Sequence, residues 1–136
     1  MFRLLRDLRR QHVPVDGVGL QMHLSTNDAP TLRQVRRNMM RFESLGLEVD
    51  ITEMDVRLRL PANGAELAQQ ARIYQEMLDA CLAAPNCKSF ALWGFTDKYS
   101  WIPGNFPGWG DALIFDADFQ PKPAYRALVD RLRRRY

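Results

Sequence analysis

The sequence predicts an α/β fold with parallel strands, and two observations support this fold class. Segments with apolar residues at helical spacing alternate with shorter runs in which every second residue is apolar, in the order helix, strand, helix, strand, helix, strand, helix. Strands that are separated by helices usually pair in parallel, through right-handed crossovers. The chain has no internal repeat, low-complexity segment or linker, so residues 1–136 are expected to form one structural unit.

Four segments have the apolar spacing of amphipathic helices. The second begins near Thr31, with Gln34 at the spacing of a capping box, and Gly46 is expected to end it in a left-handed conformation. Pro14 and Pro85 follow the first and third helices, where proline prevents the helix from continuing. The expected helices span residues 2–11, 31–44, 65–82 and 121–132.

The middle strand, expected at residues 47–58, carries two acids. Strand alternation places four side chains on one face, namely Val49, Ile51, Glu53 and Asp55. Both carboxylates therefore project the same way, near the carboxyl end of the strand, where parallel α/β proteins build their sites. Buried carboxylates cost free energy unless they are hydrogen-bonded, which favours a functional role.

The flanking strands, expected at residues 18–23 and 88–95, carry further polar and aromatic side chains. Gln21 and His23 share one face of the first strand, and Trp93 ends the third. Because adjacent parallel strands lie about 4.8 Å apart, His23 is expected to reach Glu53 and Asp55. A long loop with several aromatic residues, residues 96–119, follows the third strand.

The composition excludes several classes of protein. Hydrophobic residues make up 46% and charged residues 26% of the chain, as in folded globular domains. The net charge of +3 comes largely from arginines near both ends of the chain. They coincide with expected helices and accompany no recognition motif, so we expect no nucleic-acid partner. No apolar run approaches the ~20 residues of a membrane span, and the two cysteines fit no metal-binding spacing.

Three motifs, GVGLQMHLS, VDITEMDV and FALWGFTDKYSWIP, closely resemble the C-terminal part of the family 10 glycoside hydrolases, the endo-1,4-β-xylanases. They occur in the same order and at the same spacing, and the resemblance covers essentially the whole chain. It implies part of a (β/α)₈ TIM barrel, with the three strands as the sixth to eighth. It also implies a secreted, retaining hydrolase that acts on β-1,4-xylan and needs no cofactor or metal.

Matched position by position, the resemblance assigns three catalytic roles. Glu53 corresponds to the nucleophile, His23 to the histidine that hydrogen-bonds the nucleophile, and Asp55 to the acid that orients this histidine. The chemistry needs these residue types. A retaining glycosidase forms a covalent intermediate on an ionised carboxylate, and a hydrogen-bonded histidine would keep that carboxylate ionised and aimed.

The resemblance also assigns binding and structural residues. Gln21, Trp93 and Trp101 correspond to positions that contact the substrate near the cleaved linkage. Flat aromatic faces suit the apolar C–H faces of sugar rings. Cys81 and Cys87 correspond to a pair that forms a disulfide in some members, which fits an exported protein.

The sequence departs from the family in length. A complete (β/α)₈ barrel needs about 250 residues, and neither the first five strands nor the family's Asn-Glu motif, which holds the acid/base glutamate, is found in this sequence. We therefore expect a fragment or a truncated gene product, inactive or nearly so by itself, with the N-terminal part of its own barrel as partner.

Two other functions remain open at this stage. One is a non-catalytic carbohydrate-binding module that uses three tryptophans, Trp93, Trp101 and Trp109. The other is a small three-layer α/β domain with a metal site formed by three side chains, His23, Glu53 and Asp55. A single histidine is a weak donor set for a transition metal.

Overall fold

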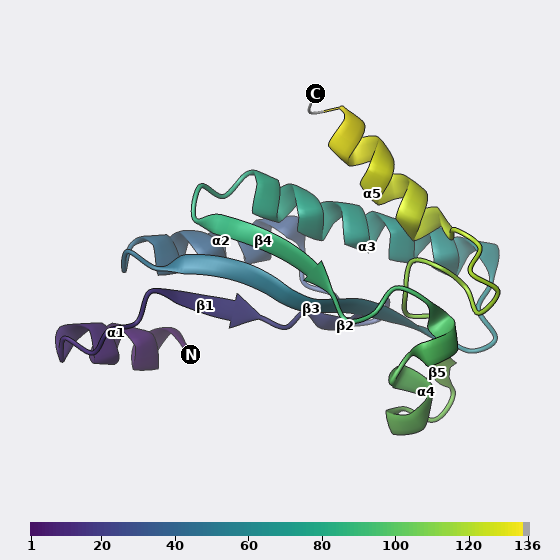
Figure 1. Cartoon of the computed structure of the whole chain (residues 1–136), viewed down its shortest axis with the longest axis horizontal. Coiled ribbons are helices and arrows are strands. Elements are labelled where there is room, and N and C mark those ends of the chain that lie inside the picture. Colours follow the sequence, from purple (N-terminus) through teal and green to yellow (C-terminus); the bar gives the residue numbers. More distant parts are fainter. Residues whose placement is uncertain (135–136) are drawn as a thin grey trace.

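The computed structural model describes residues 1–134, in which helices and strands alternate as expected (Figure 1). The helices are α1 (Phe2–Arg10), α2 (Leu32–Glu43), α3 (Gly64–Leu82), α4 (Ile102–Asn105) and α5 (Pro123–Arg133), with a 3₁₀ turn η1 (Asp97–Tyr99). The strands are β1 (Gly17–Leu20), β2 (His23–Ser25), β3 (Glu48–Arg59), β4 (Cys87–Leu92) and β5 (Trp109–Gly110).

The long strand β3 is the centre of the sheet. β1 and β2 pair with it along one edge and β4 along the other, all in parallel, which confirms the predicted fold class. β5 adds a short antiparallel pairing at the end of β3. Figure 1 shows α2 and α3 along one side of the sheet, with α5 beside α3.

β3 carries one more residue than its neighbours in the middle of the sheet. Leu20 pairs with Ile51, and His23 pairs with Asp55. An advance of three residues on the neighbouring strands therefore corresponds to an advance of four residues on β3. On the other edge, the pairing shifts between Ile51 and Met54 in the same way. This irregularity is a β-bulge, which changes the side of the sheet to which the following residues point.

The bulge corrects one sequence prediction. Val49 and Ile51 were expected to share a face with the two acids, but they are fully buried in the same core cluster as Met54 and Val56. Strict alternation cannot place residues 49, 51, 54 and 56 on one side of a strand, whereas one inserted residue does so. The acids consequently lie on the face opposite the helices.

The first expected strand is divided in two. β1 ends at Leu20 and β2 begins at His23, because Met22 takes a positive φ of 60° that interrupts the extended chain. The expected loop after β4 is also more regular than predicted, since it contains η1, α4 and β5.

The helix termini follow local sequence signals. Thr31 caps α2 and forms a complete capping box with Gln34, as predicted. α3 has a second capping box, between Asn63 and Glu66, which the sequence analysis missed and which starts this helix one residue earlier than expected. Gly46 has a φ of 70°, a left-handed conformation that glycine adopts without steric cost.

The core lies between the sheet and the helices. It combines buried side chains of β3 with those of α2 and α3, among them Val35, Met39, Phe42, Val49, Ile51, Met54, Val56, Ile73, Tyr74 and Met77. Phe90 and Leu92 of β4 pack against this cluster, on the face predicted from alternation. In residues 1–134, no helix combines the length and the apolarity needed to cross a membrane.

A buried ion pair joins the segment after β4 to the start of α5. The ammonium of Lys122 lies 2.8 Å from a carboxylate oxygen of Asp97 and donates to the carbonyl oxygen of Asp111. The other Asp97 oxygen accepts from the backbone N–H of Leu113. Burial raises the pKa of Asp97, and the charge of Lys122 only partly offsets this effect.

Loss of the Lys122 charge should destabilise the fold. Lys122→Met leaves the buried Asp97 carboxylate unpaired, which should lower the free energy of unfolding by about 3 kcal/mol. The double variant Asp97→Asn, Lys122→Met keeps an acceptor for Leu113 and removes both charges, so it should recover most of this loss. Urea unfolding measures both values.

The exposed pair Lys88–Glu48, 3.8 Å apart, provides a matched control. Lys88→Met should change stability by less than about 1 kcal/mol. A Lys122→Met variant no less stable than Lys88→Met, or a double variant less stable than Lys122→Met, would contradict a structural role for the buried pair.

A disulfide joins Cys81, at the end of α3, to Cys87, at the start of β4. Reduction should lower the free energy of unfolding by about 2 kcal/mol, because the cross-link restricts the unfolded chain over a short loop. Cys81→Ala, Cys87→Ala should be insensitive to reductant. Thiol titration of the denatured, unreduced protein should find no free thiol, and two free thiols would refute the bond.

Candidate active site

The site is centred on His23, which bridges two carboxylates of β3. Its Nδ1 lies 2.9 Å from Oδ2 of Asp55, and its Nε2 lies 3.1 Å from Oε2 of Glu53. The pairing of His23 with Asp55 across β2 and β3 fixes the position of the ring. An ionised carboxylate only accepts hydrogen bonds, and a neutral imidazole has a single N–H donor. Both hydrogen bonds can therefore exist at the same time when the imidazole is doubly protonated or when one carboxyl group keeps a proton.

The two carboxylates differ in burial. Asp55 is fully buried, and its Oδ2 accepts from His23 and from the indole N–H of Trp101, at 2.8 Å. Its Oδ1 is buried and has no hydrogen-bond partner among residues 1–134. The side chain of Glu53 is 24% exposed. A molecule in solution can therefore reach Glu53, whereas Asp55 faces only protein groups.

Two tryptophans surround the imidazole. The ring of Trp101 lies 4.9 Å from that of His23, and the ring of Trp93 lies 6.3 Å away on an edge-to-face contact. Trp93 is 50% exposed, a large fraction for an apolar ring. The structure thus brings together five of the residues singled out from the sequence at one end of the parallel strands.

Two other candidate residues, Gln21 and Trp109, lie outside this group of five. Gln21 is exposed in the break between β1 and β2 and lines an open cavity of about 760 Å³ that His23 also borders. Trp109 belongs to β5, where the guanidinium groups of Arg57 and Arg59 lie over its ring. Two cations thus lie over the Trp109 ring, and among the described aromatic contacts none joins Trp109 to Trp101, which weakens the hypothesis of a three-tryptophan binding module.

The geometry also argues against the metal hypothesis. A histidine binds a metal through a ring nitrogen with a free lone pair. Both nitrogens of His23 are engaged with carboxylates. Within residues 1–134, no group of three or more His, Cys, Asp or Glu side chains is arranged to hold a metal ion.

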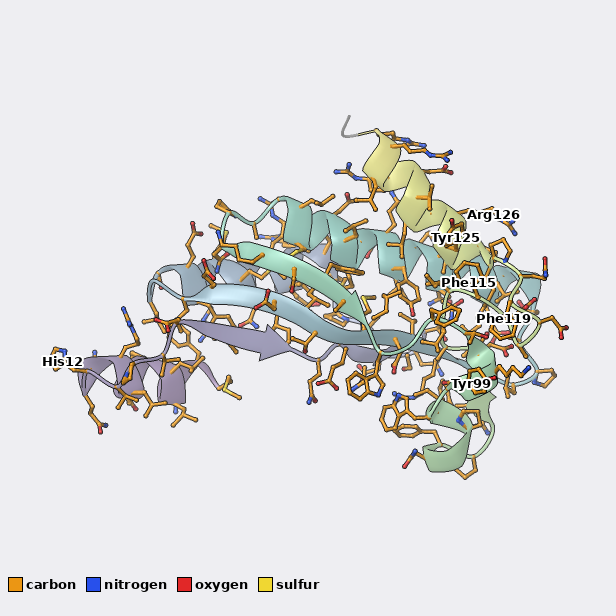
Figure 2. The ribbon with its side chains drawn as sticks, viewed as in Figure 1. His12, Tyr99, Phe115, Phe119, Tyr125 and Arg126 are labelled. Carbon is orange, nitrogen blue, oxygen red and sulfur yellow. A yellow bond between two sulfur atoms is a disulfide. The ribbon has the colours of Figure 1, made fainter. Side chains whose placement is uncertain are left out.

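Other aromatic side chains gather in the segments that follow β4. Figure 2 shows Tyr99 and Phe119 near each other, and Phe115 near Tyr125. Phe95 contacts both Phe115 and Phe119. These contacts involve several aromatic residues of the expected loop at residues 96–119. Among the described aromatic contacts, none joins these rings to His23.

Two residues that support Trp101 were not predicted from the sequence. Phe106 packs edge-on against the Trp101 ring at 5.6 Å, and Arg57 lies over Phe106 at 4.3 Å. The spacing of Arg57, two residues after Asp55 on the same strand face, was the available signal.

Comparison with known proteins identifies relatives of this arrangement. The family model described as glycosyl hydrolase family 10 matches residues 1–131. An endo-1,4-β-xylanase of Agaricus bisporus is 42% identical over 130 residues, which is 96% of this chain and 38% of the relative. Endo-1,4-β-xylanase B of Thermotoga neapolitana is 42% identical over 129 residues, 94% of this chain and 37% of the relative.

Solved structures agree with these sequence relatives. Xylanase 10B from Thermotoga petrophila RKU-1, in complex with xylobiose, superposes with a TM-score of 0.94 at 44% identity and covers 98% of this chain. Native xylanase 10B from Thermotoga maritima gives a TM-score of 0.93 at 43% identity. The chain spans about two-fifths of each of these structures. With a family model over nearly its whole length and a matching fold, the chain belongs to glycosyl hydrolase family 10.

Proposed function

We propose that this chain is the C-terminal, nucleophile-bearing part of an endo-1,4-β-xylanase catalytic domain. The observation that carries the proposal is the hydrogen-bonded series from Asp55 through His23 to Glu53, with Glu53 as its accessible end. In this proposal, residues 1–136 form the C-terminal part of the catalytic domain and supply strands six to eight of its (β/α)₈ barrel.

The geometry suits covalent catalysis with retention of configuration. Glu53 attacks the anomeric carbon, its carboxylate oxygen bonds to that carbon, and the bond to the leaving oxygen breaks. A hydrogen bond from His23 Nε2 fixes the direction of the Glu53 carboxylate. Asp55 holds the imidazole through Nδ1, and the Trp101 donor holds Asp55 in turn.

The substrate proposal rests on the relatives and on the aromatic side chains. Trp93, half exposed beside His23, offers a flat face to a xylose ring, and Trp101 contacts the same imidazole. Gln21, exposed in the break between β1 and β2, is proposed as a further substrate contact. The bound xylobiose in the Thermotoga petrophila structure supports a xylo-oligosaccharide ligand. The disulfide fits a secreted protein, since disulfides persist in oxidising compartments.

Retention also requires a second carboxyl about 5–5.5 Å from the nucleophile, to protonate the leaving oxygen. Three acids of this chain that lie on or near its strands are poorly suited to that role. Asp97 is buried against Lys122. Asp50 accepts from the hydroxyl of Ser89, and Glu48 lies beside Lys88 near the start of β3. We propose that the acid belongs to the N-terminal part of the barrel.

That N-terminal part is also the partner that fits the open sheet edges. In residues 1–134, β1, β2 and β4 pair only with β3, so both edges of the sheet have free backbone groups. A cavity of about 760 Å³ lies along β1, and one of about 560 Å³, lined by Leu78, Phe90, Leu92 and Leu128 among others, lies along β4. Further strands of the same barrel would pair with these edges and fill these cavities.

Glu53 should be the residue that a mechanism-based inhibitor labels. A 2-fluoroxylobioside with a dinitrophenolate leaving group needs no protonation, so it isolates nucleophilic attack from acid catalysis. We expect peptide mapping by mass spectrometry to find the label on Glu53 in this chain assembled with the N-terminal part of the Thermotoga petrophila relative. Glu53→Gln should remove the label, and labelling of Asp55 would refute the assignment.

The chain alone should hydrolyse xylan poorly. Loss of positioned acid catalysis lowers the rate of hydrolysis by a factor of about 10²–10⁴. Loss of the rest of the sugar-binding surface should lower the rate further. Addition of the N-terminal part of the relative should restore activity, measured as release of reducing sugar. Turnover by the chain alone at the level of an intact relative, abolished by Glu53→Ala, would show that this chain contains its own acid.

A further inference from the structure

The face of β3 that carries the acids continues beyond them with two arginines. Glu53, Asp55, Arg57 and Arg59 follow one another at strand alternation. The first two form the carboxylate site. The next two lie under the aromatic residues of the segment 101–110.

Arg57 makes its contacts with rings rather than with acids. Its guanidinium lies 4.3 Å from the ring centre of Phe106 and 5.5 Å from that of Trp109. Its Nε is buried and has no hydrogen-bond partner among residues 1–134, and no ion pair of Arg57 occurs there. A partly desolvated cation over an aromatic face is attracted to it by the charge distribution of the ring.

Phe106 transmits this contact to the site. Its ring meets the Trp101 ring edge-on at 5.6 Å. Trp101 in turn contacts His23 at 4.9 Å and donates its indole N–H to Asp55. One continuous series of contacts therefore runs from Arg57 through Phe106 and Trp101 to the residues that orient Glu53.

The backbone of this segment has a separate anchor. Ile102 is fully buried in a small cluster with Ala112 and Leu113. Asn105 donates its side-chain N–H to the carbonyl oxygen of Trp101. These contacts fix where α4 lies, and the Trp101, Phe106 and Trp109 side chains pack against this cluster. Besides this packing, the Trp101 ring has two aromatic contacts, one with His23 and one with Phe106.

We propose that Arg57 is a positioning residue for the active site, which acts through Phe106 to hold the Trp101 indole against Asp55. Among the hydrogen bonds, ion pairs and ring contacts of residues 1–134, none joins Arg57 to Glu53, so its effect is proposed to reach the Glu53 carboxylate through Trp101, Asp55 and His23. The importance of this role for catalysis rests on the proposed function, but the contact series itself does not.

Hydrogen exchange of the Trp101 indole N–H in the full chain tests the proposal. Arg57→Met keeps the apolar stem and removes the planar cation. The exchange rate of this proton should rise about tenfold, as expected for loss of a partly desolvated cation–π contact. The nitrogen shifts of the His23 ring should change as well, because Asp55 loses one of its two donors. The exchange of the Leu113 amide should stay unchanged, since Ile102 still anchors the segment.

Two further variants keep the test decisive. Phe106→Leu removes the intermediate ring and should give the same result as Arg57→Met, including in the case that Arg57→Met does not fold. Arg59→Met removes a cation that contacts only Trp109 among the described ring contacts, and should leave Trp101 exchange unchanged. Arg57→Lys should lie between the wild type and Arg57→Met, because the ammonium keeps the charge without the planar face.

An unchanged Trp101 exchange rate in folded Arg57→Met or Phe106→Leu would overturn the proposal. Equal acceleration of Trp101 and Leu113 exchange would also overturn it, because the effect would then be general loosening of the segment. Failure of the proposed function gives a different result: the fluoroxylobioside would not label Glu53, while the Trp101 proton would still respond to Arg57→Met and not to Arg59→Met.

Discussion

Between Ile51 and Met54, β3 contains one residue more than the strands that flank it, and the rest of the structure depends on this insertion. Before the insertion, Val49 and Ile51 point into the core. After it, the core receives Met54 and Val56, and the odd-numbered residues turn to the opposite face. A strand with strict alternation would have to bury either its acids or its apolar side chains on the wrong side.

The irregular segment after β4 is held by buried polar groups. Gln70 and Lys122 donate to the carbonyl oxygen of Asp111, and Tyr74 donates to that of Ala112. The backbone N–H of Val56 reaches the same Ala112 oxygen, which joins the segment to β3. Burial of backbone carbonyls in a loop costs free energy unless donors meet them, and these side chains supply the donors. Burial also raises the pKa of Tyr74 well above its usual range, which keeps its hydroxyl protonated as a donor.

The sequence predicted the regular elements because they depend on local patterns, and the strand ends that these patterns define predicted which candidate site residues lie together. Apolar spacing located the four long helices, and alternation located β4 and its two faces. The bulge was not predicted because the alternation of Val49 and Ile51, when extended to Glu53, contains no inserted residue. The apolar residues Met54, Val56 and Leu58 already show the change of phase. The break at Met22 and the support of Trp101 by Arg57 depend on tertiary contacts, which no short-range pattern contains.

The hydrogen bonds on Asp55 have a consequence for how the site forms during folding. Its two donors, His23 and Trp101, lie 32 and 46 residues away along the chain, on opposite sides of it in sequence. Each contact requires closure of a long segment of chain. Closure lowers the entropy of the chain before the contact contributes any stabilisation, so such contacts form later than local structure. Pairing of β2 with β3 brings His23 to Asp55, whereas the Trp101 contact also needs the segment after β4 to pack against the sheet. Local opening of that segment would remove the Trp101 donor from Asp55 while the strands stayed paired and the helices stayed packed on the sheet, so the complete site can be lost without global unfolding.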